Sequence, residues 1–139
     1  MKKDIEFPKV EGVKLAIAKK ESEFDTNNAP DNVEWAVYCI NTNEFVIRNV
    51  LITSRGYGGE GDERKTSTLR HMIDAIKPHQ SEVIEPIDPS VFDLFNEYWI
   101  SYYVNDVIYD KKFVFPPFST TETLLSDIKI LHLKGILHE

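Results

Sequence analysis

The sequence predicts an all-β fold, an immunoglobulin-like β-sandwich of about seven short strands. Several short runs are rich in Val, Ile and aromatic residues and alternate between apolar and polar positions. Pro, Gly, Asn and Asp separate these runs at modest spacing, which is typical of sandwiches. No long amphipathic helix alternates with the runs, which argues against a doubly wound sheet. At 139 residues the chain has the size of one domain, so we expect a single domain over 1–139.

The clearest element is a β-hairpin between residues 98 and 115. Its two arms are dense in aromatic and β-branched residues, and Asn105-Asp106 lies between them. Asn and Asp tolerate a positive φ, so this pair can form a two-residue turn. Shifting the pairing of the two arms by one residue would move apolar side chains to the polar face. The alternating pattern and the predicted register therefore support each other. The predicted register pairs Val104 with Val107, Tyr102 with Tyr109, Ile100 with Lys111, and Tyr98 with Phe113.

The other predicted strands are shorter. The turn residues 41–44 are expected to join two of them into a second strand pair. Ser119 and Glu122 have capping-box spacing, which predicts a turn of helix near the C-terminus. A last strand is then expected to end at Gly135. The predicted strands cover 13–18, 33–40, 45–54, 80–87 and 128–133.

Residues 66–77 are ambiguous. Leu69, Met72, Ile73 and Ile76 have helical spacing, and Thr66 or Ser67 could cap such a helix before Pro78. At period two the same segment is a strand with Leu69, His71 and Ile73 on one face. We favour the strand because its neighbours form a sandwich-like series. The alternative is an α+β fold with a helix at 66–77.

Charge and cysteine content restrict the function classes. The net charge is −7 and the pI is about 5.1, which disfavours binding to a nucleic-acid backbone or to an anionic membrane. No apolar run has the roughly 20 residues of a membrane helix, and no apolar segment follows Lys2-Lys3 as in a secretion signal. Cys39 is the one cysteine, so no intrachain disulfide forms. We therefore expect a cytoplasmic protein.

The segment 55–64 carries four glycines in six positions, from Gly56 to Gly61. It lacks the Gly-Lys-Ser/Thr of a phosphate-binding loop and the strand–helix context of a dinucleotide fingerprint. Glu60, Asp62 and Glu63 would also repel phosphate. We expect a flexible hairpin loop whose glycines adopt positive φ.

No metal, cofactor or catalytic set is predicted. The histidines at 71, 79, 132 and 138 lack metal-pair spacing, and Cys39 has no Cys-x-x-Cys partner. Asp106 and Asp110 could bind calcium only if the fold converged them with carbonyl oxygens. A hydrolase-like enzyme using the 55–74 region is an alternative hypothesis. It would need a concave pocket beside the loop, with Ser67 near a His71 that is hydrogen-bonded to a carboxylate.

The leading functional hypothesis is a non-catalytic module that binds a protein partner or a second copy of itself. Trp99 and Tyr103 lie on the more polar face of the predicted hairpin, where they either pack or form an exposed aromatic patch. The glycine-rich loop and exposed sheet edges are further candidate contacts. The candidate binding residues are Arg55, Tyr57, Arg64, Trp99 and Tyr103.

Four blocks of the sequence are distinctive, namely 53–58, 65–72, 96–99 and 109–113. On these blocks the sequence resembles a small family of uncharacterised bacterial proteins, over most of the chain. Some members carry the label of a phenylalanyl-tRNA synthetase subunit. Residues 59–64 also match the letters Gly-x-Gly-x-Glu-Arg of a class II synthetase motif, although Glu60 and Asp62 replace apolar residues. A class II catalytic domain is much longer than this chain, so the resemblance implies an accessory module that contacts RNA or tRNA. The contacts would come from Arg55, Arg64, Lys65 and Arg70 with Tyr57.

Overall fold

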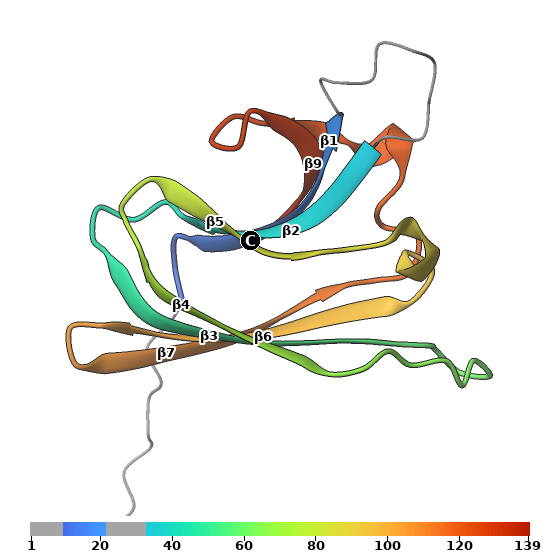
Figure 1. The fold of residues 1–139 in the computed structure, drawn as a ribbon, viewed down its shortest axis with the longest axis horizontal. Coiled ribbons are helices and arrows are strands. Elements are labelled where there is room, and N and C mark those ends of the chain that lie inside the picture. The colour runs from blue at the N-terminus through green and yellow to red at the C-terminus, as the bar shows by residue number, and fades with distance from the viewer. Residues whose placement is uncertain (1–9, 22–32) are drawn as a thin grey trace, which may run out of the picture.

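The computed structural model describes residues 10–21 and 33–139, which form two antiparallel sheets packed as a β-sandwich (Figure 1). Sheet A has the strand order β5-β2-β1-β9-β8, and sheet B has the order β4-β3-β6-β7. The strands are β1 (Val13–Glu21), β2 (Val33–Asn41), β3 (Ile47–Tyr57), β4 (Leu69–Ile76), β5 (Gln80–Pro86), β6 (Phe95–Val104), β7 (Val107–Phe115), β8 (Ser126–Ile128) and β9 (Leu133–His138). Two short 3₁₀ turns, η1 (Pro89–Val91) and η2 (Glu122–Leu124), complete the described elements.

The predicted all-β sandwich is confirmed, with nine strands in the described residues where about seven were expected. The immunoglobulin-like connectivity stays a prediction. In the described ranges no helix is long and apolar enough to span a bilayer. Residues 1–8, which include the lysines considered as a possible leader, lie outside the described part of the chain.

The β6–β7 hairpin has the predicted register. Val104 pairs with Val107 and Tyr98 pairs with Phe113, so Asn105 and Asp106 form the two-residue turn. Asn105 has a φ of 53°, the left-handed conformation that Asn tolerates. Alternate side chains of the hairpin therefore point toward sheet A and away from it.

Residues 69–76 form strand β4, as favoured, and the helix alternative at 66–77 is wrong. The segment pairs along β3 at the edge of sheet B, with Met72 opposite Leu51. His71 and Ile73 are half-buried, whereas Met72 is exposed. The segment is too short for its pattern to distinguish the helical spacing from the period-two spacing of a strand, and hydrogen bonding to β3 selects the strand.

The expected pairing of 33–40 with 45–54 is wrong, because β2 and β3 lie in different sheets. β2 pairs with β1 and β5, and β3 pairs with β4 and β6. The turn between them is a crossing from one layer to the other (Figure 1). Asn41 fixes this crossing, because its buried side-chain amide lies 2.8 Å from the Phe45 carbonyl oxygen and 3.0 Å from that of Ile76.

The C-terminal region also differs from the prediction. The expected strand 128–133 is instead a turn between β8 and β9, and Gly135 lies inside β9 rather than after it. Gly135 pairs with Ala18 of β1 and with Ser126 of β8. The expected helical turn forms as η2, but its N-cap residue is Thr121 rather than Ser119.

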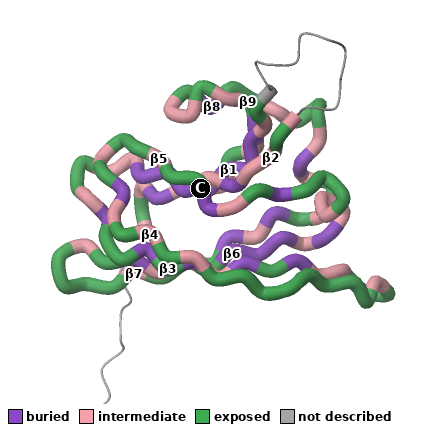
Figure 2. Tube along the Cα trace, viewed as in Figure 1, coloured by how far each residue is buried: buried purple, intermediate pink, exposed green. Residues whose placement is uncertain are grey.

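The main core lies between the two sheets. Figure 2 shows the buried segments on the strands of the two facing layers, whereas the hairpin tip and the 60–70 region are exposed. A second, smaller cluster lies under the β8–β9 turn and contains Ala16, Ile40 and Ile128. The main core contains Leu15, Ile17, Val37, Cys39, Ile52, Ile100, Tyr102 and Phe113, among others.

Candidate functional site

The outward face of sheet B carries an apolar strip, here called the outer-face patch. It consists of Leu51, Met72, Trp99, Tyr103 and Ile108, whose exposed fractions lie between 37% and 64%. Cross-strand pairing places Leu51 beside Met72, and Tyr103 beside Ile108. The structure thus places Trp99 and Tyr103 on an exposed surface rather than in the core. The patch extends over all four strands of the sheet.

Charged residues continue this face beside Trp99. The ammonium of Lys112 lies 5.8 Å from the centre of the Trp99 ring, within cation–π distance. Arg55 Nε donates to Glu97 Oε2 at 2.7 Å and its guanidinium lies 5.2 Å from the Tyr57 ring. Hydrogen bonding to Glu97 raises the pKa of Arg55. Four of the five candidate binding residues therefore lie on the outer face of sheet B, namely Arg55, Tyr57, Trp99 and Tyr103.

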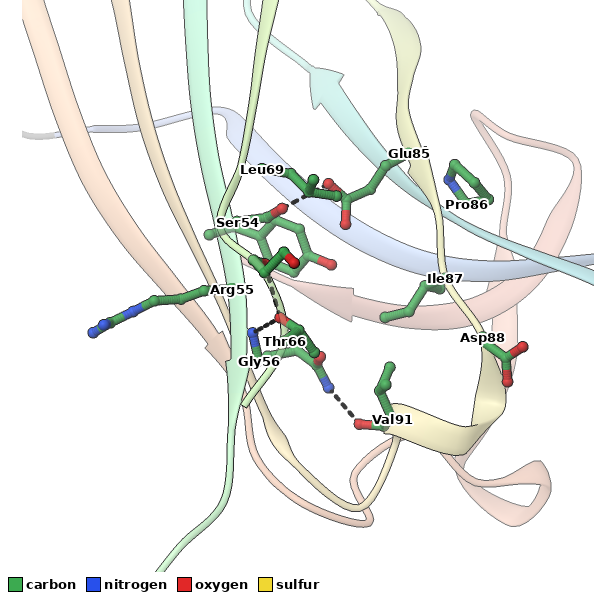
Figure 3. A pocket seen from close by; sticks show the side chains of 13 residues that line it. Ser54, Arg55, Gly56, Thr66, Leu69, Glu85, Pro86, Ile87, Asp88 and Val91 are labelled. Atoms are coloured by element: carbon green, nitrogen blue, oxygen red, sulfur yellow. Dashed lines mark hydrogen bonds between the residues drawn. The ribbon is translucent and has the colours of Figure 1, made fainter. Parts of the chain in front are cut away.

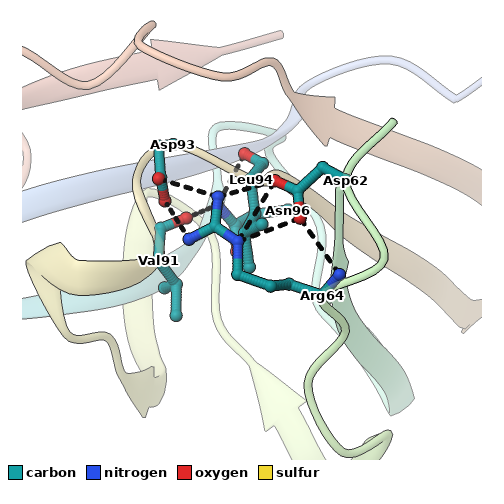
Figure 4. A network of polar contacts seen from close by, with 6 residues as sticks. All are labelled: Asp62, Arg64, Val91, Asp93, Leu94 and Asn96. Carbon is teal, nitrogen blue, oxygen red and sulfur yellow. Dashed lines mark hydrogen bonds and ion pairs between the residues drawn. The ribbon is translucent and has the colours of Figure 1, made fainter. Parts of the chain in front are cut away.

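Arg64 makes separate contacts (Figure 4). Its guanidinium contacts the Asp62 carboxylate at 2.6 Å and the Asp93 carboxylate at 2.8 Å. These contacts tie the 58–64 loop to the segment after η1. The basic strip expected for RNA contact therefore has two of its four cations, Arg55 and Arg64, already paired with carboxylates.

The glycine-rich segment is shorter as a loop than expected. Gly56 lies in strand β3, and Tyr57 bridges to Lys65. Of the four glycines only Gly61 has a positive φ, of 82°. The loop closes through a hydrogen bond from the Gly58 amide to the Arg64 carbonyl oxygen at 2.8 Å.

A pocket lies between the two sheets where β4 and β5 diverge; we call it the Glu85 pocket (Figure 3). Glu85 Oε1 accepts a hydrogen bond from Ser54 Oγ at 2.7 Å and lies 2.6 Å from His71 Nε2. The cavity measures about 250 Å³. Its lining includes Ser54, Ser67, Leu69, Glu85, Ile87, Val91, Asn96 and Tyr98.

Sequence reasoning named neither Glu85 nor Ser54 as a functional residue. Glu85 was assigned to a short strand, and Ser54 to the end of another. A polar residue at an inward position of a predicted strand is the one signal that could have identified them, because buried polar groups need partners. Nothing in the sequence indicates that these two strands meet across the layers.

The geometry required by the hydrolase hypothesis is present in part. There is a concave pocket beside the loop, Ser67 lines it, and His71 is bonded to a carboxylate. However, Ser54 and His71 contact the same oxygen of Glu85, and within the described ranges no serine hydroxyl is hydrogen-bonded to a histidine. A base positioned to take a proton from a serine is therefore not formed by these groups.

The remaining polar candidates are dispersed. His79 contacts the exposed Glu44, while His138 packs against Phe113 and Phe115. Cys39 is buried in the core, and this burial raises the pKa of its thiol to about 12. Among residues 10–21 and 33–139, no group of three or more His, Cys, Asp or Glu is arranged to hold a metal ion.

Comparison with protein-family models, with curated proteins and with solved structures finds no match to this chain. The resemblance to the bacterial family carrying the synthetase label therefore stays a prediction. The function must be argued from the geometry of the outer-face patch and the Glu85 pocket.

Proposed function

We propose that this chain is a cytoplasmic self-associating module, and that two copies pack through the outer-face patches of their B sheets. The observation that carries the proposal is the outer-face patch itself, an apolar strip across a four-stranded sheet. Within the described ranges no other strand or turn covers it. Contiguous exposed apolar surface of this kind marks interaction sites in soluble proteins.

The arrangement of residues on the face favours a second copy as the occupant. Met72, Leu51 and Ser101 form one cross-strand row. Trp99 and Tyr103 lie two residues to either side of Ser101 on β6. A two-fold axis along this row would therefore place Trp99 of one copy against Tyr103 of the other. Self-complementarity of this kind is what a two-fold interface requires.

The charges on the edge strand β4 are consistent with the same axis. Arg70 and Asp74 lie two residues to either side of Met72, and both are exposed. The two-fold rotation would place Arg70 of each copy opposite Asp74 of the other. Asp110 continues the row at the opposite edge strand, so the same rotation places the Asp110 carboxylates of the two copies opposite each other, a contact that opposes association; each accepts from Ser101 Oγ at 3.1 Å.

The size of the face is adequate for a small interface. With strands about 4.8 Å apart and the eight residues of β4 rising about 3.3 Å each, the four strands cover roughly 500 Å² before side-chain relief is counted. A standard protein interface buries about 800 Å² of accessible surface on each partner. Packing of two whole faces would therefore give a small interface, of the size found in weak or transient complexes.

The test is the oligomeric state by light scattering, with Leu51→Lys as the disrupting variant. Leu51 lies on the proposed axis and is half-exposed, so Lys should be tolerated by the fold but not by the interface. Leu124→Lys is the matched control, because Leu124 has a similar exposure and lies in η2. We expect a wild-type dimer, a monomeric Leu51→Lys variant and a dimeric control.

Two outcomes would contradict the proposal. A wild-type chain that stays monomeric at high micromolar concentration has no self-association. A Leu51→Lys chain that dimerises as well as wild type would place the interface elsewhere. Thermal unfolding of each variant shows whether the fold is intact, and the Trp99→Ala, Tyr103→Ala double variant provides an independent disruption of the same face.

A further inference from the structure

The Glu85 pocket is a second feature, distinct from the outer-face patch and on the opposite side of sheet B. Its polar groups come from both layers: Ser54 and Asn96 from sheet B, and Glu85 from sheet A. Leu69, Ile87 and Val91 supply apolar wall. A small volume with apolar walls and a few convergent polar groups is the usual form of a small-molecule site.

Two acceptor oxygens of the pocket have no protein donor, and the Ser67 and Tyr98 hydroxyls that also line it have no partner within the described ranges. Glu85 Oε1 receives both of that carboxylate's hydrogen bonds, so no donor within the described ranges contacts Oε2. Asn96 uses its amide nitrogen on the carbonyl oxygens of Val91 and Leu94, and its Oδ1 receives no donor from that part of the chain. Both side chains are largely buried, and burying an acceptor without a donor costs free energy.

Neither of these oxygens is sealed from outside the protein. In the described residues every polar side-chain atom that is fully buried has a hydrogen-bond partner. Glu85 Oε2 and Asn96 Oδ1 must therefore reach an accessible space, and both residues line this cavity. A ligand or solvent donor can reach them there.

The charged groups that line the pocket also favour a cationic ligand. Arg55 contributes to the lining, but its guanidinium points away from the cavity and bonds to Glu97 on the outer face (Figure 3). The Tyr98 hydroxyl is neutral, because burial and the nearby Glu85 charge raise its pKa. Asp88 adds a second carboxylate at the rim, where it accepts from the Ser90 amide at 2.8 Å. Among residues 10–21 and 33–139, no lysine lines the pocket.

We propose that the Glu85 pocket binds a small primary amine with a short aliphatic chain. The ammonium donates to Glu85 Oε2, and the aliphatic chain lies against Leu69, Ile87 and Val91. An ammonium has three donors and no acceptor, which complements the acceptor oxygens that have no protein donor. The cavity of about 250 Å³ lies below the usual range of about 300–1,000 Å³, so the ligand must be small.

The experiment is an NMR titration of the full chain with n-butylamine as the probe. Butanoate and 1-butanol have similar chains with an anionic and a neutral polar group. We expect butylammonium to shift the amide signals of Ser54, Glu85 and Asn96 with an affinity of about 1–10 mM, as suits so small a ligand. Butanoate should cause no shift in these signals. Equal binding of butanoate, or no shift with millimolar butylamine, would overturn the proposal.

Two variants locate the site. Glu85→Gln retains the shape of the side chain but removes its charge, and should weaken binding roughly tenfold or more. Glu82→Gln is the matched control, an exposed glutamate on the same strand β5, and should bind as wild type does. Leu69→Trp fills the pocket from an exposed position without altering Glu85, and should abolish binding even if Glu85→Gln fails to fold. A Leu69→Trp chain that binds normally would contradict the assignment.

Discussion

At the scale of single residues, the structure shows which charged groups are available to partners and which are not. Arg64 is fixed between Asp62 and Asp93, and Arg55 is bonded to Glu97. A guanidinium held by carboxylates contributes less to binding a phosphate, because the anion must first replace its partner. Arg55 keeps a role on the outer face through its contact with the Tyr57 ring. Arg64 serves to hold the 58–64 loop.

The Asp62–Arg64 pair makes a prediction about acid titration. Hydrogen bonding from Arg64 lowers the pKa of Asp62 from the ordinary value of 3.8 to about 2. Since the folded pKa is depressed, the pair stabilises the fold above about pH 4, and this stabilisation is lost as pH falls toward 2. In Arg64→Ala the pKa of Asp62 should return toward 3.8, as measured by carboxyl-carbon NMR. An Asp62 that titrates at the same pH in both chains would show that the pair does not form in solution.

At the scale of elements, strand β9 depends on Gly135, the residue that was predicted to end the last strand. Gly135 is buried between β1 and β8. A Cβ at this position would collide with the backbone oxygen of Ile17 and would lie 2.8 Å from the Ala18 Cα. Because these are backbone atoms of a central strand, they cannot move without disturbing sheet A. The glycine thus allows the C-terminal strand to approach β1 closely.

Gly135→Ala should therefore destabilise the fold, by about 1–3 kcal/mol, the usual cost of overpacking. The measurement is the free energy of unfolding in urea. Ser126→Ala is the control, because Ser126 is the exposed β8 partner of Gly135 and should change stability by less than about 0.5 kcal/mol. If both variants unfold at the wild-type urea concentration, β9 does not pack as closely as described.

At the scale of the whole molecule, Asn41 joins the two layers. It ends β2 in sheet A, and its amide nitrogen lies within hydrogen-bond distance of carbonyl oxygens at Phe45, Ile76 and Lys77. Ile76 is the last residue of β4 in sheet B. A buried side chain therefore fixes how the end of one sheet lies on the end of the other.

Asn41→Ala should lower the free energy of unfolding by about 2–4 kcal/mol, because it removes the donor from the buried Ile76 carbonyl oxygen and from two part-buried carbonyl oxygens. Guanidinium denaturation followed by tryptophan fluorescence measures this. Asn43→Ala is the comparison, since the Asn43 side-chain amide donates to the Glu11 carbonyl oxygen in an exposed contact and its loss should cost less than about 1 kcal/mol. Equal losses in the two variants would assign no special role to the buried amide.

The candidate site was only partly predictable. The alternation of the β6–β7 hairpin separated Trp99 and Tyr103 from the core-facing residues, but it did not show whether they were covered. The same register placed Ile108 beside Tyr103. Leu51 and Met72 could not be assigned to this surface, because they lie on strands outside the hairpin. The Glu85 pocket was predicted only as a condition of the hydrolase hypothesis, which required a carboxylate beside His71 but did not identify it.

By itself the sequence determined the all-β class, the period-two segments and the register of β6–β7, because alternation and turn chemistry act between residues close in the chain. Only the tertiary structure decided that β2 and β3 belong to different sheets, that β9 passes through Gly135, and that Glu85 meets Ser54 and His71. These features depend on hydrogen bonds and contacts between distant segments. The free energy of these contacts depends on which strands are neighbours in the two sheets, and local sequence patterns do not specify those neighbours.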